Sequence, residues 1–129
     1  MPKESKRQLQ IGELIRRNFG QVLQAEGSYI FGTEIFVTVT AVKMTPDMGI
    51  AKIYVSVFNA ADQAAKDEVL AKIRKNLWRL KSGLVHRIKR HVRRIPHLDV
   101  YLDVTLDEMY NLNNVFDNLR ASNQLGEEE

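Results

Sequence analysis

Residues 34–58, EIFVTVTAVKMTPDMGIAKIYVSVF, decide the fold that the sequence predicts. The runs 34–44 and 50–58 are rich in β-branched and aromatic side chains, which favour β-strands. Between them, the segment TPDMG at 45–49 has the Pro-Asp-x-Gly order of a tight turn. The stretch therefore predicts a β-hairpin. On the second strand we expect one face to carry Ala51, Ile53, Val55 and Val57, and the other to carry Lys52, Tyr54, Ser56 and Phe58.

Helical periodicity flanks the hairpin on both sides. Before it, apolar residues recur at helical spacing behind a Ser5-x-x-Gln8 capping box, which predicts a helix over about 6–26 that stops at Gly27. After it, apolar residues keep a 3.6-residue period from Leu70 onward, which predicts helical structure to about residue 94. Because both segments are amphipathic, we expect each to bury one side against the hairpin.

The second helical region is expected to bend. In a straight helix, Lys81 would point into the apolar sector, and Gly83 weakens the helix by about 1 kcal/mol relative to alanine. A bent helix or a pair of helices is therefore favoured over one straight rod. A Lys81 side chain that reaches out to solvent from a straight helix is the alternative.

The segment after Pro96 predicts one more strand and one more helix. Pro96 ends the helical region, and apolar residues alternate with polar ones from Leu98 to Val104, as in a strand with one solvated face. A second capping box then opens a predicted C-terminal helix over 107–121, followed by an acidic tail over 122–129 that we expect to be disordered. The fold class is α+β, with bent or paired helices on one face of a three-stranded sheet.

The composition indicates one domain of a cytoplasmic protein. The chain has 129 residues, of which 44% are hydrophobic, so it can bury a core. We expect a flexible start over 1–5 and a domain over 6–106. Cysteine is absent, and no apolar run is long enough to cross a bilayer or to act as a secretion signal. Neither a cofactor nor a membrane partner is therefore expected.

Charge is strongly segregated along the chain. Residues 71–98 contain ten Lys and Arg, three His and no acid, whereas residues 99–129 contain eight acids and one base. A solvated helix face usually interleaves acids with its bases, so the acid-free segment favours a polyanion-binding surface. The first helix can extend this surface if it packs alongside. The residues predicted to bind nucleic acid are Lys72, Lys75, Arg79, Lys81, Arg87, Lys89, Arg90, Arg93 and Arg94, with Arg7, Arg16, Trp78 and His86 as secondary candidates.

The remaining chemistry-bearing residues give weaker signals. Trp78 lies among lysines and arginines and could stack on an unpaired base, although partial burial is the commoner fate of such a residue. The three histidines, His86, His91 and His97, lack the i to i+4 spacing of a metal site, so no metal is expected. Asp99 and Asp103 are expected to be solvated strand residues rather than a catalytic pair, so the chain is not expected to be an enzyme.

Three stretches resemble the ribosome-binding factor A family. The most specific is Asp47-Met48-Gly49-Ile50-Ala51-Lys52-Ile53-Tyr54-Val55-Ser56, and it is joined by Leu80-Lys81-Ser82 with the Arg87-Ile88-Lys89 and Pro96-x-Leu98 that follow. The opening helix, from Arg7 to Arg16, is similar but less specific. Together the stretches span about residues 5–110. The resemblance implies a type II KH-like fold, and it places a helix kink at Asn76-Leu77-Trp78, so that Asn76 and Gly83 are both candidate bend positions.

The resemblance also implies a function. Family members are non-catalytic assembly factors, so the chain is expected to bind 16S rRNA of the immature 30S subunit and to assist late 30S maturation and rRNA end processing. It further implies a monomer, a part in growth in the cold, and displacement by an assembly GTPase. The sequence departs from ordinary KH domains because no Gly-x-x-Gly loop joins the paired helices. A DNA-binding or chromatin-architectural domain that uses the same basic helix is the alternative, and an RNA-processing nuclease that uses Asp99 or Asp103 is the weakest hypothesis.

Overall fold

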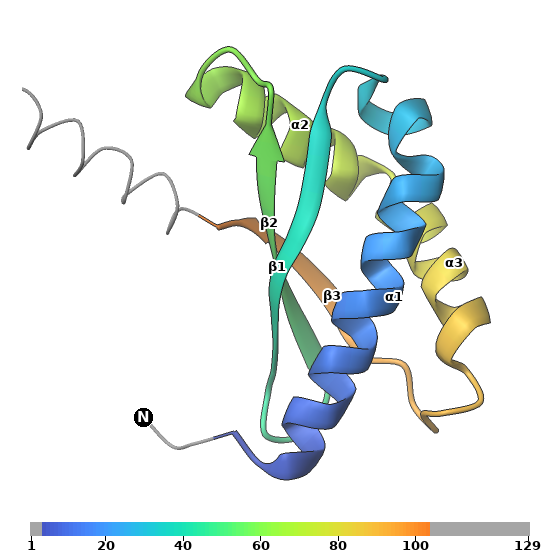
Figure 1. Cartoon of the computed structure of the whole chain (residues 1–129). Coiled ribbons are helices and arrows are strands. Elements are labelled where there is room, and N and C mark those ends of the chain that lie inside the picture. The colour runs from blue at the N-terminus through green and yellow to red at the C-terminus, as the bar shows by residue number, and fades with distance from the viewer. Residues whose placement is uncertain (1–3, 104–129) are drawn as a thin grey trace, which may run out of the picture.

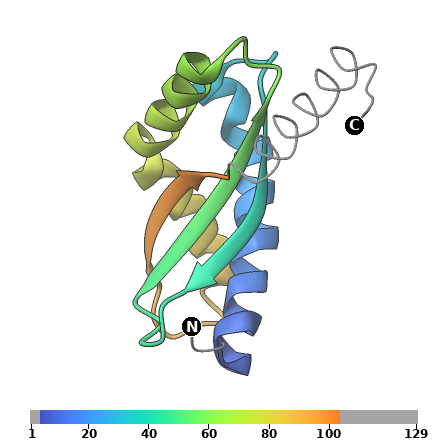
Figure 2. The ribbon, with the colours of Figure 1, turned by 90° about the vertical axis from the view of Figure 1, so that its left-hand side faces the viewer.

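The computed structural model describes residues 4–103, which form one layer of helices on one sheet (Figure 1). The elements, in chain order, are α1 (Lys6–Phe31), β1 (Phe36–Met44), β2 (Ile50–Phe58), α2 (Gln63–Lys75), α3 (Leu77–Ile88) and β3 (His97–Leu102). The sheet has the order β1-β2-β3, with β1 antiparallel and β3 parallel to β2. All three helices lie on the same side of it (Figure 2). This arrangement confirms the predicted α+β fold.

The predicted hairpin is confirmed, including the facing of its second strand. Phe36 pairs with Phe58 at one end and Met44 with Ala51 at the other, and a bulge interrupts the register between Val39 and Ala41. The alternate residues from Ala51 to Val57 are at most 5% exposed. In the turn, the Asp47 carboxylate accepts hydrogen bonds from the Thr45 hydroxyl (2.7 Å) and the Gly49 amide (2.9 Å). These two bonds hold the turn that the sequence predicts.

Helix α1 begins as predicted, but its predicted end at residue 26 is wrong. Ser5 and Gln8 form the expected reciprocal capping box. Gly27, however, lies inside the helix, where a Cβ would be 2.7 Å from the Phe31 ring, so this glycine leaves space for an aromatic ring one turn later. The helix ends instead at Gly32, whose φ of 95° is left-handed backbone that favours glycine.

The second helical region divides at Asn76, one of the two predicted positions. The Asn76 backbone amide donates to the carbonyls of Lys72 (3.1 Å) and Ile73 (3.2 Å), and its side chain donates to the Lys72 carbonyl (2.9 Å). Gly83 is not the bend. A Cβ there would be 3.1 Å from Val22, so the glycine permits close packing of α3 on α1.

Helix α3 ends at Ile88, so the prediction of helix to about residue 94 is wrong. The chain has to leave the helical layer and reach the sheet edge, where the His97 amide donates to the Gly49 carbonyl at 2.8 Å. The segment 89–96 makes this crossing as a turn, and Val92 keeps its apolar contact without being helical. The last residue of the predicted third strand, the predicted C-terminal helix over 107–121 and the acidic tail over 122–129 lie outside the described residues.

The core lies between the helices and the sheet. Its largest fully buried side chains come from five of the six elements, and burying them from water supplies the main driving force for the fold. They are Ile15, Phe19 and Leu23 of α1, Ile53 and Val55 of β2, Ile73 of α2, Leu80, Leu84 and Ile88 of α3, and Leu98 and Val100 of β3. With the apolar faces turned inward, the polar faces of α2 and α3 are presented to solvent.

Candidate nucleic-acid interface

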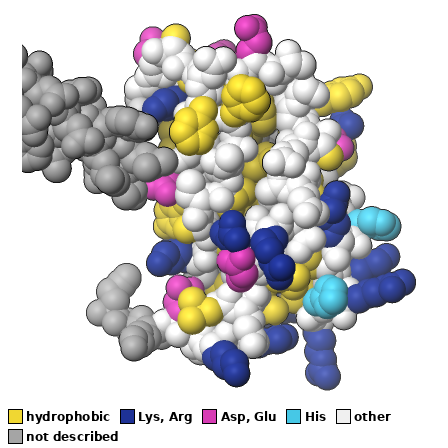
Figure 3. All heavy atoms as spheres, viewed as in Figure 1, with side chains coloured by type: hydrophobic (Ala, Val, Ile, Leu, Met, Phe, Trp, Pro, Cys, Tyr) yellow, Lys and Arg dark blue, Asp and Glu magenta, His cyan; other side chains and the backbone are white. Residues whose placement is uncertain are grey.

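Basic side chains line the outer side of α2 and α3 and the turn that follows. The predicted binding residues that are exposed, which we call the cationic surface, are Lys72, Lys75, Arg87, Lys89, Arg90, Arg93 and Arg94. The other two predicted residues, Arg79 and Lys81, are half-buried. In Figure 3, Lys, Arg and His side chains gather at the lower right, at the end of the molecule where α3 and segment 89–96 lie. The structure therefore displays most of the predicted residues to solvent, as phosphate binding would require.

Arg79 is tied to α1 rather than free on the surface. Its Nε lies 2.5 Å from Oε1 of Glu26, and its guanidinium stands over the Tyr29 ring, 4.6 Å from the centroid. Segment 71–98 has no acid of its own, but the neighbouring helix supplies one. This pairing was missed from the sequence because residues 26 and 79 meet only when α1 packs on α3.

Arg74 also has a structural role. It donates two hydrogen bonds, of 3.1 and 2.6 Å, to the Val100 carbonyl, and it stands 5.8 Å from the centroid of the Tyr101 ring. Tyr101 in turn stacks on Tyr54 with 5.6 Å between centroids. Arg74 therefore connects α2 to β3.

Helix α1 lies beside α3, so it can extend the cationic surface. The Arg87 guanidinium donates to the Gln21 side chain at 2.7 Å. Arg16 is engaged by Glu13 through contacts of 2.8 and 2.5 Å. This hydrogen bonding holds the pKa of Glu13 below its ordinary value and raises the pKa of Arg16. Arg7 is exposed near the start of the helix, so of the two secondary arginines it is the more accessible to a ligand.

Arg94 lies at the hairpin turn. Its guanidinium is near Gly49, where a Cβ would be only 2.8 Å from Nη2. The pKa of Asp47 is lowered, first by the Thr45 hydrogen bond, then by the Gly49 amide, with a smaller contribution from the Arg94 charge. The turn thus brings one carboxylate to the border of the cationic surface, and Gly49 leaves the room that Arg94 needs.

Trp78 and His86 are both on the surface of α3. Trp78 is 73% exposed, an unusual position for the largest aromatic side chain, and it lies just after the Asn76 bend. His86 borders a shallow hollow of about 410 Å³ between α1 and α3, together with Arg79 and Arg87. Both side chains are placed where a ligand of the cationic surface can reach them.

Asp99 and His97 of β3, and Asp103 just after this strand, each contact a nearby side chain. His97 Nε2 lies 3.3 Å from Asp99, and the Thr40 hydroxyl donates to Asp103. Over residues 4–103, no cluster of three or more His, Cys, Asp or Glu is placed to hold a metal ion. In the same part of the chain, no helix is long and apolar enough to span a bilayer.

Fold and surface together define a class: a small α+β domain whose paired helices carry an exposed cationic surface, as in proteins that bind nucleic acid. Comparison with known proteins is more specific. The family model described as Ribosome-binding factor A matches residues 7–116. The chain belongs to this family.

Individual relatives agree with that assignment. Ribosome-binding factor A of Flavobacterium psychrophilum is 32% identical over 111 residues, covering 86% of this chain and 83% of the relative. Ribosome-binding factor A of Chlorobium phaeobacteroides is 39% identical over 94 residues, which cover 72% of this chain and 76% of the relative. The crystal structure of ribosome-binding factor A from Thermus thermophilus aligns with a TM-score of 0.59 at 21% identity, over 74% of this chain and 94% of that one, which supports the fold.

A second solved structure concerns a complex. It is a homology model of the Thermus thermophilus protein fitted into a cryo-EM map of a complex with the 30S subunit. It aligns with a TM-score of 0.56 at 22% identity and covers 78% of this chain and 96% of that one. At this level of identity the likeness shows a shared fold.

Proposed function

We propose that the protein is a non-catalytic assembly factor that binds 16S rRNA of the immature 30S subunit. The observation that carries the proposal is the cationic surface, in a member of the ribosome-binding factor A family. A polyanion such as rRNA is bound by neutralising its phosphates and releasing their counterions. The Thermus thermophilus relative, which was fitted into the map of a 30S complex, supports the choice of rRNA over DNA as the partner.

The cationic surface acts by docking against RNA phosphates. Lys89, Arg90 and Arg93 supply the central contacts because they are exposed on the turn after α3 and have no ion pair with an acid in residues 4–103. Lys72 and Lys75 extend the contact to the end of α2, and Trp78 stacks on an unpaired base beside them. Arg79 contributes less, because Glu26 already neutralises it.

In this mechanism the bound protein holds one conformation of the rRNA late in maturation and thereby assists processing of the RNA ends. An assembly GTPase then displaces it before the subunit enters translation. The protein acts in the cytoplasm as a monomer, without a cofactor, and its action matters most in the cold, where RNA rearranges slowly.

The test reverses charge at two places. The double variant Lys89→Glu/Arg90→Glu is expected to lose co-sedimentation with small ribosomal subunits, because two phosphate contacts become repulsions. The matched control is Lys43→Glu/Lys52→Glu, which makes the same change in net charge at a register pair of the sheet, away from the helices. Undiminished co-sedimentation of the first variant, or equal loss in both, would remove the proposed mechanism. Preference for duplex DNA over rRNA at physiological salt would favour a DNA-binding domain instead.

A further inference from the structure

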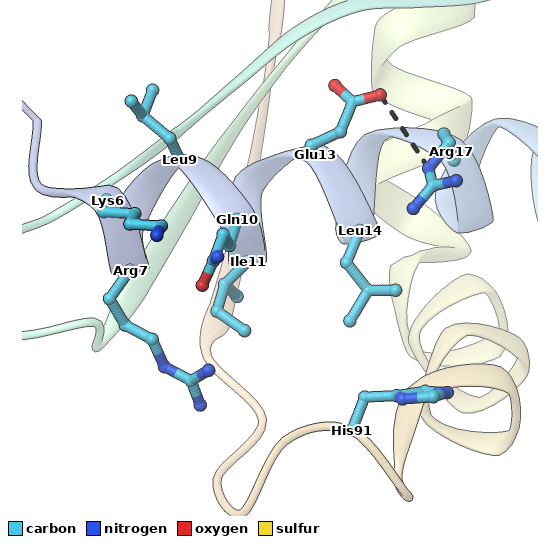
Figure 4. A pocket seen from close by; sticks show the side chains of 9 residues that line it. All are labelled: Lys6, Arg7, Leu9, Gln10, Ile11, Glu13, Leu14, Arg17 and His91. Atoms are coloured by element: carbon cyan, nitrogen blue, oxygen red, sulfur yellow. Dashed lines mark ion pairs between the residues drawn. The ribbon is translucent and has the colours of Figure 1, made fainter.

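The cationic surface borders a groove whose floor is apolar. The groove has a volume of about 550 Å³ and lies between the first half of α1 and the turn that follows α3 (Figure 4). We call it the α1 groove. Its existence depends on the early end of α3 at Ile88, since from there the chain turns toward β3 and leaves this side of α1 uncovered.

The side chains divide into a floor and a rim. Ile11 and Leu14 point from α1 toward His91 on the opposite side, and both pack against the core (Figure 4). Arg7 and Arg17 stand along the same helix, one before and one after these two residues. The acid of the groove, Glu13, is already engaged by Arg16 at 2.5 Å and lies 3.8 Å from Arg17. The rim is therefore cationic.

An apolar floor inside a cationic rim matches a nucleotide. The base of an unpaired nucleotide presents flat, weakly hydrated faces, while its two flanking phosphates are anionic. The volume falls within the range of about 300–1,000 Å³ that is typical of small-molecule sites. A neighbouring hollow shares Arg7 and Ile11 with the groove and reaches Arg93 and Arg94, so the groove adjoins the cationic surface.

We propose that the α1 groove receives one unpaired nucleotide extruded from the bound rRNA. Its base packs on Ile11 and Leu14, and its phosphates meet Arg7, Arg17 and His91. The Gln10 amide, next to Ile11 on the groove side of the helix, offers a donor and an acceptor to the edge of the base. The inference rests on the proposed function and adds to it a second contact to an unpaired base, besides stacking on Trp78, which phosphate contacts do not provide.

The experiment compares two RNA hairpins that differ by one unpaired adenosine in the stem. We expect the full-length protein to bind the bulged hairpin about tenfold more tightly, the order expected for burying one base. Leu14→Asn should remove the share of this preference that the groove supplies, whereas Trp78→Ala should remove only the share that stacking on Trp78 supplies. Leu14→Met keeps the floor apolar and should retain the preference. Arg7→Ala should weaken binding of both hairpins, because it removes a phosphate contact.

A second readout is independent of affinity. With 2-aminopurine in place of the bulged adenosine, fluorescence should rise on binding, as the base leaves the stack for an aliphatic groove, and Leu14→Asn should not show the rise. Thermal unfolding of each variant checks that it is folded. Equal affinity for the two hairpins with no change in fluorescence would overturn the groove assignment while leaving the proposed function intact. If the protein bound neither hairpin and also failed to bind small-subunit RNA, the proposed function would be overturned, and the inference with it.

Discussion

At the scale of single residues, two glycines in helices have opposite roles. Gly83 faces Val22 across the α1–α3 contact, with 3.1 Å between a Cβ at this position and the valine methyl. Gly20, in α1, has no atom within 4 Å of such a Cβ apart from its chain neighbours and the backbone of its own helix. Glycine weakens a helix wherever it stands, so Gly83 is explained by close packing, whereas Gly20 is a weak point that packing does not require.

Substitutions at these two glycines should therefore change stability in opposite directions. Gly83→Leu forces α1 and α3 apart and should lower the free energy of unfolding by about 1–3 kcal/mol. Gly20→Ala should raise it by up to about 1 kcal/mol, since helix propensity improves without a clash. Urea denaturation followed by circular dichroism measures both. A stabilised Gly83→Leu would show that the helices are not closely packed.

The Glu26–Arg79 pair leads to a prediction about binding. Glu26 removes one cation from the cationic surface, so Glu26→Gln should free Arg79 and tighten binding to 16S rRNA several-fold at constant salt, as expected for one added phosphate contact. Glu34→Gln is the matched control, because it removes the same charge from the exposed end of the hairpin. Equal gains for both variants would mean that only net charge matters and that the pair is not part of the interface.

At the scale of elements, the sequence predicted the type of every described helix and strand, while two of the helix ends were wrong. The hairpin was predicted well because its alternation of apolar and polar residues, with a Pro-Asp-x-Gly turn, depends on neighbours in sequence. Gly27 led to the wrong helix end, because a glycine often marks a helix stop. The structure shows that Gly27 instead leaves room for the Phe31 ring. The end of α3 was missed because the turn at 89–96 is determined by the distance to the sheet edge, although Val92 keeps the helical spacing.

The hairpin turn should make a small, pH-dependent contribution to stability. The pKa of Asp47 is lowered from its ordinary value of 3.8, with the Thr45 hydrogen bond as the main cause. A lowered pKa in the folded state means that the ionised group stabilises the fold above pH 3.8, and that this contribution is lost as the pH falls through the lowered value. Asp47→Ala should therefore be less stable than the parent chain at pH 7, and the difference should shrink toward pH 2.

Denaturant midpoints of the two proteins across this pH range measure the contribution of Asp47. Comparing them at each pH removes the contribution of the other carboxylates, which both proteins share. A difference that stays constant from pH 7 to pH 2, or grows as the pH falls, would show that the charge of Asp47 does not hold the turn.

At the scale of the whole molecule, charge segregation in the sequence was enough to locate the candidate surface, and the exposed residues at 72–94 follow that prediction. The contacts within this surface could be predicted only once the fold was known. Only packing of α1 on α3 shows that Arg79 is neutralised, and only the crossing from α3 to β3 opens the α1 groove. The groove was missed because His91 lies on the turn after α3, far in sequence from Lys6 and Arg17 of α1, and no spacing in the sequence joins the two segments.

The most direct test of electrostatic docking is the affinity for 16S rRNA measured as a function of potassium chloride concentration. Counterion release predicts a linear fall of log K against log salt, with a slope that becomes shallower by about 0.7 for each phosphate that the protein no longer neutralises. Lys89→Gln/Arg90→Gln should therefore reduce the slope by about 1.4, while Lys43→Gln/Lys52→Gln should leave it unchanged. Affinity that persists undiminished as salt rises would contradict electrostatic docking.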